Sequence, residues 1–284
     1  MRVHFAGTRG SVPVTRPDRA TFGGDTTCLL VTGNGGEQVV LDCGSGLANV
    51  AARLTAGPDL LILLTHFHLD HLVGLTGFPL LHTPGAQLVF AAPATGELSV
   101  GEALGGLFRA PYWPVDLEAC GADLSFADLP RASGTEPMLL RGLEIRWAPL
   151  PHPGGCTAYR LDEPATGASL VLATDAEWDG APAASRETFL RLCREPTPCR
   201  LLIGDGQYDD ATAPERRGWG HSSVSAMVAL AREAGCDRLL LTHHDPGDDD
   251  AALLAREAEL QAVLPGALLA RQGRELDLAR KDRS

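Results

Sequence analysis

Residues 60–71 read Leu-Leu-Ile-Leu-Leu-Thr-His-Phe-His-Leu-Asp-His, and this stretch decides the fold. Its first five residues form a continuous apolar run, which is typical of a strand covered on both faces. His66 and His68 are two residues apart, so an extended backbone turns both to one side. Asp70 and His71 follow where the chain bends. Because divalent transition metals bind imidazole and carboxylate groups, the stretch predicts a metal site at a strand end better than a helix start with incidental histidines.

Three later residues stand in the same context. His152, Asp175 and His243 each follow an apolar run that we expect to form a strand. Such strand ends are where α/β proteins gather their functional groups. Taken singly, each residue could also be a polar side chain that ends a strand and meets water. Together with residues 66–71, they predict a complete set of metal ligands.

Short apolar runs recur along the whole chain, first close together and then separated by helical stretches. The expected helices are Gly46–Ala56, Ser185–Arg194, Ser222–Glu233 and Asp249–Val263. Ser222 or Ser223 can cap the third helix, Gly235 can end it, and Ala267–Leu276 reads as a hairpin. The expected strands are Arg2–Phe5, Cys28–Val31, Gln38–Leu41, Leu60–Leu64, Gln87–Ala91, Leu143–Ala148, Thr157–Leu161, Ser169–Ala173, Arg200–Gly204 and Arg238–Leu241.

The chain of 284 residues is expected to form one domain over residues 1–278, followed by a frayed tail over residues 279–284. The stretch Gly105–Pro137 is rich in glycine, proline and aromatic residues, so we interpret it as a long loop or lid. Its aromatic residues could line a substrate lid, form a dimer contact or pack in the core: Phe108, Tyr112 and Trp113.

Charge and composition exclude several classes of function. The net charge of −12 disfavours binding to DNA or RNA, because long polyanions need a segregated basic patch. No apolar run approaches the ~20 residues of a membrane-spanning helix, and the amino terminus has no signal-peptide pattern, so we expect a cytoplasmic protein. The seven cysteines include no Cys-x-x-Cys pair, which favours small buried side chains over a disulfide framework.

The ligand motif in residues 66–71, together with His152, Asp175 and His243, resembles the metallo-β-lactamase fold superfamily. Within it, the chain is most similar to the phosphodiesterase branch, which includes tRNase Z and cyclic-phosphate or cyclic-nucleotide phosphodiesterases. The resemblance spans roughly residues 1–265. Asp25 departs from the asparagine of the branch's Gly-Gly-Asn-Thr element. Four further segments fit the branch: Gly7–Pro13, Gly23–Cys28, Leu41–Gly46 and Gly220–Ser223.

This resemblance implies an α/β fold, a four-layer αβ/βα sandwich with two metal ions at one edge. We expect zinc, with manganese or iron as alternatives, because His and Asp ligands accept all three. His243 is preferred over its neighbour His244, since it lies closer to the strand. The implied ligands are His66, His68 and His152 for one metal, Asp70, His71 and His243 for the second, and Asp175 between the two.

The resemblance also implies the chemistry. Two metals, two aspartates and a bridging hydroxide sum to about +1, which suits a small anionic phosphodiester, and the metals would lower the pKa of the bridging water toward ~7. Asp70 could orient the hydroxide, and His221 is the candidate general acid, with a helix cap as its alternative role. Asp205 could orient His221. Arg217 and Trp219, with Arg216, could contact phosphate and base or lie in a solvated loop.

We therefore expect a dinuclear phosphodiesterase that cleaves a small cyclic nucleotide or cyclic phosphate. We do not expect DNA, tRNA or a membrane as partners, and the resemblance allows a homodimer. The alternatives are tRNA 3′-end processing, hydrolysis of a lactone, thioester or lactam by the same fold, and a metal-bound sensor or scaffold without turnover.

Overall fold

The computed structural model describes residues 1–55, 59–94, 98–134 and 136–279. Within these residues, fourteen strands form two seven-stranded sheets. The first sheet has the strand order β14-β1-β2-β3-β4-β5-β6, and its members are β1 (Arg2–Gly7), β2 (Cys28–Thr32), β3 (Gln38–Leu41), β4 (Asp59–Leu63), β5 (Gln87–Pro93), β6 (Asp123–Leu129) and β14 (Glu275–Asp277).

The second sheet has the order β13-β12-β11-β10-β9-β8-β7. Its strands are β7 (Met138–Leu140), β8 (Leu143–Leu150), β9 (Cys156–Glu163), β10 (Ala168–Ala173), β11 (Leu201–Asp205), β12 (Arg238–Thr242) and β13 (Leu268–Leu269). In each sheet one half is antiparallel and the other parallel: β3 to β6 run in parallel, and so do β10 to β13.

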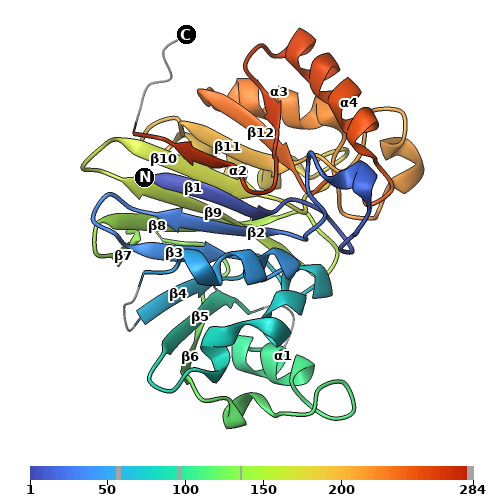
Figure 1. Ribbon diagram of the computed structural model, residues 1–284. Helices are drawn as coiled ribbons and strands as arrows, with labels where there is room; N and C mark the ends of the chain where they lie inside the picture. The colour runs from blue at the N-terminus through green and yellow to red at the C-terminus, as the bar shows by residue number, and fades with distance from the viewer. Residues whose placement is uncertain (56–58, 95–97, 135, 280–284) are drawn as a thin grey trace.

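Helices cover the outer face of each sheet. Helix α1 (Val100–Leu107) packs on β5 and β6, whereas α2 (Ala183–Arg194), α3 (Val224–Ala234) and α4 (Asp250–Val263) cover the second sheet. Figure 1 shows α1 at the bottom of the view, α3 and α4 at the top, and the sheets between them. The predicted four-layer αβ/βα sandwich is confirmed. In the described part of the chain, no helix is long and apolar enough to cross a membrane.

Three apolar cores fill the three interfaces of this sandwich. The central core joins the inner faces of the two sheets, with Phe5 and Leu29 from the first and Tyr159 and Leu161 from the second. Alternate residues of the same strands, such as Leu30, point outward into the core under α1. The third core lies between the second sheet and α2–α4. Strands buried on both faces explain the continuous Leu/Val/Ile runs in the sequence.

The ten predicted strands are confirmed to within two residues at each end, and so are three of the four predicted helices. The cap predictions hold as well. The Ser223 hydroxyl accepts the backbone N–H of Ala226 at 3.3 Å, and Gly235 ends α3 in the left-handed conformation.

The prediction of a helix over Gly46–Ala56 is wrong for the described residues. The chain forms two short 3-10 turns, Ser45–Asn49 and Ala51–Arg53, and residue 56 lies outside the described residues. The Asn49 side chain donates to the Ala6 carbonyl at 3.2 Å and to Asp25 at 2.9 Å. A Cβ on Gly46 would lie 2.6 Å from the Gly7 nitrogen. Close packing on β1 therefore holds this segment in a conformation other than a regular helix.

The predicted hairpin at Ala267–Leu276 is also wrong. Strand β13 pairs in parallel with β12 in the second sheet, whereas β14 pairs antiparallel with β1 in the first. The turn between them crosses from sheet to sheet. Backbone hydrogen bonds from Ala270 to Leu241 and from Gly273 to Phe5 hold its two ends in different sheets.

The segment Gly105–Pro137 is not one continuous loop in its described residues. It contains the end of α1 and β6, which pairs in parallel with β5 at the edge of the first sheet. Phe108 is buried and Trp113 packs against the same core, while Tyr112 is exposed. Strand β6 escaped prediction because an edge strand with solvated acidic residues lacks the apolar run of a central strand. Of the predicted tail, residues 280–284 lie outside the described residues.

Candidate metal centre

Six strands end at one edge of the sandwich, and each carries a polar side chain at its last residue or shortly after it. Strands β3 and β4 of the first sheet run in parallel, and in the second sheet β8, β10, β11 and β12 share one direction because β9 is antiparallel to both of its neighbours. Their carboxyl ends therefore meet at the same place. The side chains delivered there are Asp42, His66, His152, Asp175, Asp205 and His243.

The first group of ligand atoms consists of three histidines. One side-chain nitrogen from each of His66, His68 and His152 lies within 4.8 Å of the others. His152 Nε2 is 3.1 Å from His68 Nδ1. The loop after β4 supplies the first two histidines, and the loop after β8 supplies the third. Residues 84 positions apart in the sequence thus face one point.

The second group contains Asp70, His71, Asp175 and His243, again with ligand atoms within 4.8 Å of one another. His243 Nε2 lies 3.2 Å from Asp175 Oδ1 and 3.3 Å from Asp70 Oδ2. His71 Nε2 lies 3.2 Å from Asp175 Oδ2. Asp175 also lies 3.8 Å from His66 Nε2, so this carboxylate faces both groups.

The chemistry of these side chains fits a pair of divalent metal ions. His66 Nε2 is buried and has no hydrogen-bond partner, which is costly unless the nitrogen binds something. Burial lowers the pKa of His66 and of His152, and the neutral imidazole is the form that binds metals. Around His71, burial disfavours the charge, but Asp175 and Asp42 raise the pKa of its ring. The carboxylates thus create a potential that attracts cations.

Outer hydrogen bonds orient the histidines. Asp42 Oδ2 accepts from His71 Nδ1 at 2.8 Å, and Gln207 Oε1 lies 2.8 Å from His243 Nδ1. The Gly220 carbonyl accepts from His152 Nδ1 at 2.9 Å. With Nδ1 protonated in these three rings, each Nε2 presents its lone pair to the centre.

The backbone is strained around the same edge. Asp42, Asp175 and His243 have φ values of 61°, 56° and 61°, and Ser11 has a φ of 60°. Non-glycine residues avoid this left-handed region, where each costs roughly 1–3 kcal/mol. The strain turns the side chains at the ends of β3, β10 and β12 toward the centre. The Ser11 backbone N–H, held in the same conformation, donates to Asp70 Oδ2 at 2.7 Å.

Only one residue of the pair His243 and His244 faces the ligand groups. The His244 ring lies edge-on to Phe22 and its Nε2 bonds to the Ala270 carbonyl at 2.8 Å. Burial lowers the pKa of His244 to about 3, so the ring is neutral. The left-handed conformation of His243 turns the chain at this residue, so one histidine reaches the centre and the other the core.

His221 lies beside the ligand groups and is held by Asp205. Its Nδ1 is 2.8 Å from Asp205 Oδ2, and its ring stacks on His243 with centroids 4.9 Å apart. Burial disfavours a charged ring, but Asp205 raises the pKa of His221 to about 9. Asp205 Oδ2 also accepts the Asp175 backbone N–H at 3.1 Å. A single carboxylate therefore ties His221 to the candidate metal-bridging residue.

The two predicted substrate-binding residues differ in their surroundings. Arg217 is exposed and lines a small pocket of about 130 Å³ together with His221. Trp219 is 58% exposed, and the guanidinium of Arg216 lies 4.7 Å from its ring centroid. The Arg217 side chain is thus available to a ligand near His221, and the role of Arg217 and Trp219 in binding stays a prediction.

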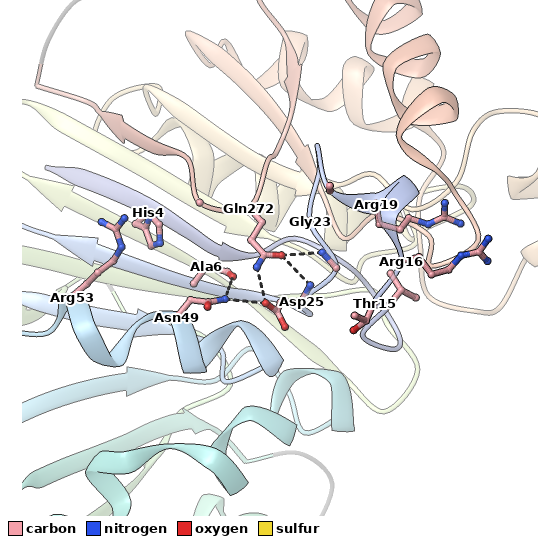
Figure 2. A pocket seen from close by; sticks show the side chains of 14 residues that line it. His4, Ala6, Thr15, Arg16, Arg19, Gly23, Asp25, Asn49, Arg53 and Gln272 are labelled. Carbon is pink, nitrogen blue, oxygen red and sulfur yellow. Dashed lines mark hydrogen bonds between the residues drawn. The ribbon is translucent and has the colours of Figure 1, made fainter.

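Asp25, which departs from the branch's asparagine, lies in a separate pocket of about 550 Å³ beside β1. Figure 2 shows its carboxylate between Asn49 and Gln272. It accepts hydrogen bonds from Asn49 at 2.9 Å, Gln272 at 2.6 Å and Ser45 at 2.8 Å. These bonds tie the loop before β2 to the turn Ser45–Asn49 and to the turn before β14. Asp25 therefore holds the opening loop together within the protein.

Two residues of the site were missed in the sequence analysis. Asp42 and Gln207 hold His71 and His243, yet neither was given a role. Asp42 was visible in the Asp-Cys-Gly segment after β3, and a carboxylate at a strand end was the available signal. Gln207 carried no signal, because its contact with His243 joins residues 36 positions apart.

We expect Asp42→Asn to weaken metal binding about 10–100-fold, the usual effect of removing a partner that orients a metal-binding histidine. The amide loses the charge that favours the Nδ1-protonated ring of His71 and cannot accept as well from Thr65, whose N–H and hydroxyl lie 2.7 and 2.8 Å from Asp42. Competition with a chelator measures the affinity. An unchanged metal affinity in a folded variant would show that Asp42 stabilises only the surrounding backbone and does not orient His71.

Comparisons with known proteins found a matching family model, relatives and structures of the same fold. The model of the beta-lactamase superfamily domain matches residues 37–244. Ribonuclease BN of Cronobacter sakazakii is 25% identical, with 95% of this chain and 97% of that protein covered. Two solved structures share the fold. The metallo-beta-lactamase fold protein YhfI of Bacillus subtilis has a TM-score of 0.68 at 18% identity, covering 97% of this chain and 99% of that one. Human tRNase Z, short form, has a TM-score of 0.65 at 18% identity, covering 98% and 99%.

Proposed function

The chain belongs to the beta-lactamase superfamily, and from this premise we propose that it is a dinuclear phosphodiesterase acting on a small cyclic nucleotide or cyclic phosphate. The coarser activity, that of a metal-dependent hydrolase, follows from the family and from the clustered His and Asp ligands. The substrate class and the roles of single residues are the proposal.

Seven side chains would hold the two metal ions. His66, His68 and His152 would bind the first ion, since their nitrogens converge on one point. Asp70, His71 and His243 would bind the second, and Asp175 would bridge both because it faces the two groups. When bound, such ions act as Lewis acids and lower the pKa of a coordinated water toward ~7. We propose zinc as the metal.

The protein's own groups complete the chemistry. Ser11 N–H fixes one oxygen of Asp70, which leaves the carboxylate positioned to orient the attacking water. With neutral histidine ligands, two bound divalent ions would outweigh the two aspartates, so the loaded centre would be cationic within a chain of net charge −12. This local charge favours an anionic phosphodiester over a neutral ester.

The observation that carries the proposal is the His221–Asp205 pair. Asp205 occupies Nδ1 of His221, so Nε2 is the nitrogen left to protonate a leaving alkoxide. The ring stacks on His243, a proposed ligand, and therefore lies within reach of a substrate held at the metals. An alkoxide leaving group needs such an acid, whereas opening a strained lactam or a thioester needs it less.

Processing of tRNA 3′ ends is the second candidate, because relatives that match nearly the whole chain are named ribonucleases. Our expectation that tRNA is not a partner finds no support in these comparisons. The small substrate is still favoured here by the acidic charge of the chain, since a tRNA-binding protein holds its ligand mainly through phosphate contacts. The two candidates share the same centre and differ only in what surrounds it.

A substrate panel decides between these functions. Zinc- or manganese-loaded protein is expected to hydrolyse bis(p-nitrophenyl) phosphate and at least one cyclic nucleotide or cyclic phosphate. Precursor tRNA is the comparison, tested at rising salt, because binding through phosphates weakens steeply with salt. Cleavage of precursor tRNA with no turnover of cyclic substrates would replace our proposal by the second candidate.

Two more outcomes of the same panel contradict the proposal. Turnover of thioesters or lactones without phosphodiesters would indicate another hydrolase of this fold. No turnover at full metal loading, measured by elemental analysis, would indicate a sensor or scaffold. The homodimer stays a prediction, which light scattering tests.

A further inference from the structure

Three cysteines meet at a place that the hydrolytic centre does not use. Cys193, Cys199 and Cys236 place their sulfur atoms within 4.8 Å of one another, and the sulfurs of Cys199 and Cys236 are 3.1 Å apart. Cys193 and Cys199 are fully buried, and Cys236 is partly exposed. The separation is well beyond the ~2.05 Å of a disulfide, so the three groups are free thiols.

The segments that carry these cysteines are held rigidly. Arg160 is fully buried, and its guanidinium donates to the carbonyls of Leu192, Cys193 and Thr197 at 2.8–2.9 Å. This fixes the chain between α2 and β11. The Asp237 N–H donates to the Cys199 carbonyl at 3.3 Å and joins that segment to the turn after α3. The thiols are therefore brought together by the fold before any ligand arrives.

The cluster lies at the opposite edge of the sheet from the metal centre. Cys199 precedes β11 and Cys236 precedes β12, whereas Asp205 and His243 stand at the other ends of these strands. At ~3.3 Å per strand residue, Cys199 and Asp205 are roughly 20 Å apart. The thiols cannot share ligands with the hydrolytic centre, so a role there would be a separate one.

We propose that Cys193, Cys199 and Cys236 bind one zinc ion through their three sulfur atoms, with water as the fourth ligand. Zinc accepts thiolates at about 2.3 Å and tetrahedral coordination, which places two bound sulfurs about 3.8 Å apart. The observed spacing needs only small side-chain movements to reach this value. Each thiol that binds releases its proton to solvent. Because Cys236 is partly exposed, the water ligand would bind on its side of the ion.

Such a site would link two connections of the second sheet. Cys193 and Cys199 flank the segment between α2 and β11, while Cys236 begins the segment between α3 and β12. None of these three cysteines forms a disulfide in the described residues. A bound ion would fasten the helix layer to the amino ends of β11 and β12.

Cobalt substitution separates this site from the hydrolytic centre. Metal-free protein kept reduced with a phosphine is titrated with Co²⁺. Thiolate ligands give an intense sulfur-to-cobalt charge-transfer absorption in the near ultraviolet, which a centre of histidines and aspartates does not give. We expect this absorption in the wild-type protein and its loss in Cys236→Ser. Elemental analysis of the zinc-loaded protein should find one equivalent fewer in this variant, with phosphodiesterase activity retained.

Cys120→Ser is the matched control, because Cys120 is also partly exposed and lies outside the cluster. It should keep both the absorption and the full metal content. Absence of the absorption in reduced wild-type protein, or its persistence in Cys236→Ser, would overturn the proposal. A Cys199–Cys236 disulfide found by mass spectrometry in protein purified without reductant would overturn it in favour of a redox pair. Since the readouts are a spectrum and a metal difference, they do not depend on the proposed hydrolytic function.

Discussion

Asp175→Ala is expected to lower phosphodiester hydrolysis at least about 10³-fold, because even a single transition-state donor is worth about 10²–10³-fold and this carboxylate serves both metals. Asp175 lies 3.2 Å from His71 Nε2, 3.2 Å from His243 Nε2 and 3.8 Å from His66 Nε2. Without it, three histidines at the centre lose the anion that faces them all. Metal content should fall together with the activity.

The measurement combines turnover of bis(p-nitrophenyl) phosphate with elemental analysis of the same preparation. Asp123→Ala is the control, since Asp123 is an exposed aspartate at the start of the edge strand β6. It should keep both metals and full activity. A folded Asp175→Ala protein that retains two tightly bound metals and near-normal turnover would disprove the bridging role.

His221→Ala should lower kcat about 10²–10⁴-fold on substrates with an alkoxide leaving group, which is the usual contribution of a general acid. The loss should be much smaller on bis(p-nitrophenyl) phosphate, because p-nitrophenolate leaves without being protonated. Asp205→Asn should show the same dependence on the leaving group with a smaller loss, since Asp205 acts on the leaving group through His221 Nδ1 and does not itself supply the proton.

Comparison of the two leaving groups distinguishes acid catalysis from a structural role. Equal losses on both substrates would mean that His221 only supports the fold at the start of α3. Metal analysis is needed as well, because ligand atoms of Asp205, His221 and His243 lie within 4.8 Å of one another. A variant that loses a metal ion would identify His221 as a ligand.

Much of the fold was predictable because its strands are buried on both faces. The apolar runs at β4, β10, β11 and β12 indicate strands even when the neighbouring strands in the sheet are unknown, and all four are confirmed. Strands at the edges of the sheets were harder to predict. Strand β6 has no fully buried residue, and β13 and β14 are two and three residues long, so pairing with neighbouring strands decides whether these segments form strands.

The candidate metal centre was also only partly predictable from the sequence. The sequence by itself determined which residue types stand at strand ends, because the spacing in residues 66–71 and the apolar runs before His152, Asp175 and His243 are local properties. Only the tertiary structure decided which of them meet. Asp42 holds His71, Gln207 holds His243 rather than His244, and Asp205 holds His221. Three cysteines converge in the same manner at the amino ends of the strands, roughly 20 Å from Asp205. Such contacts join distant parts of the chain, and their geometry exists only once two sheets have packed together.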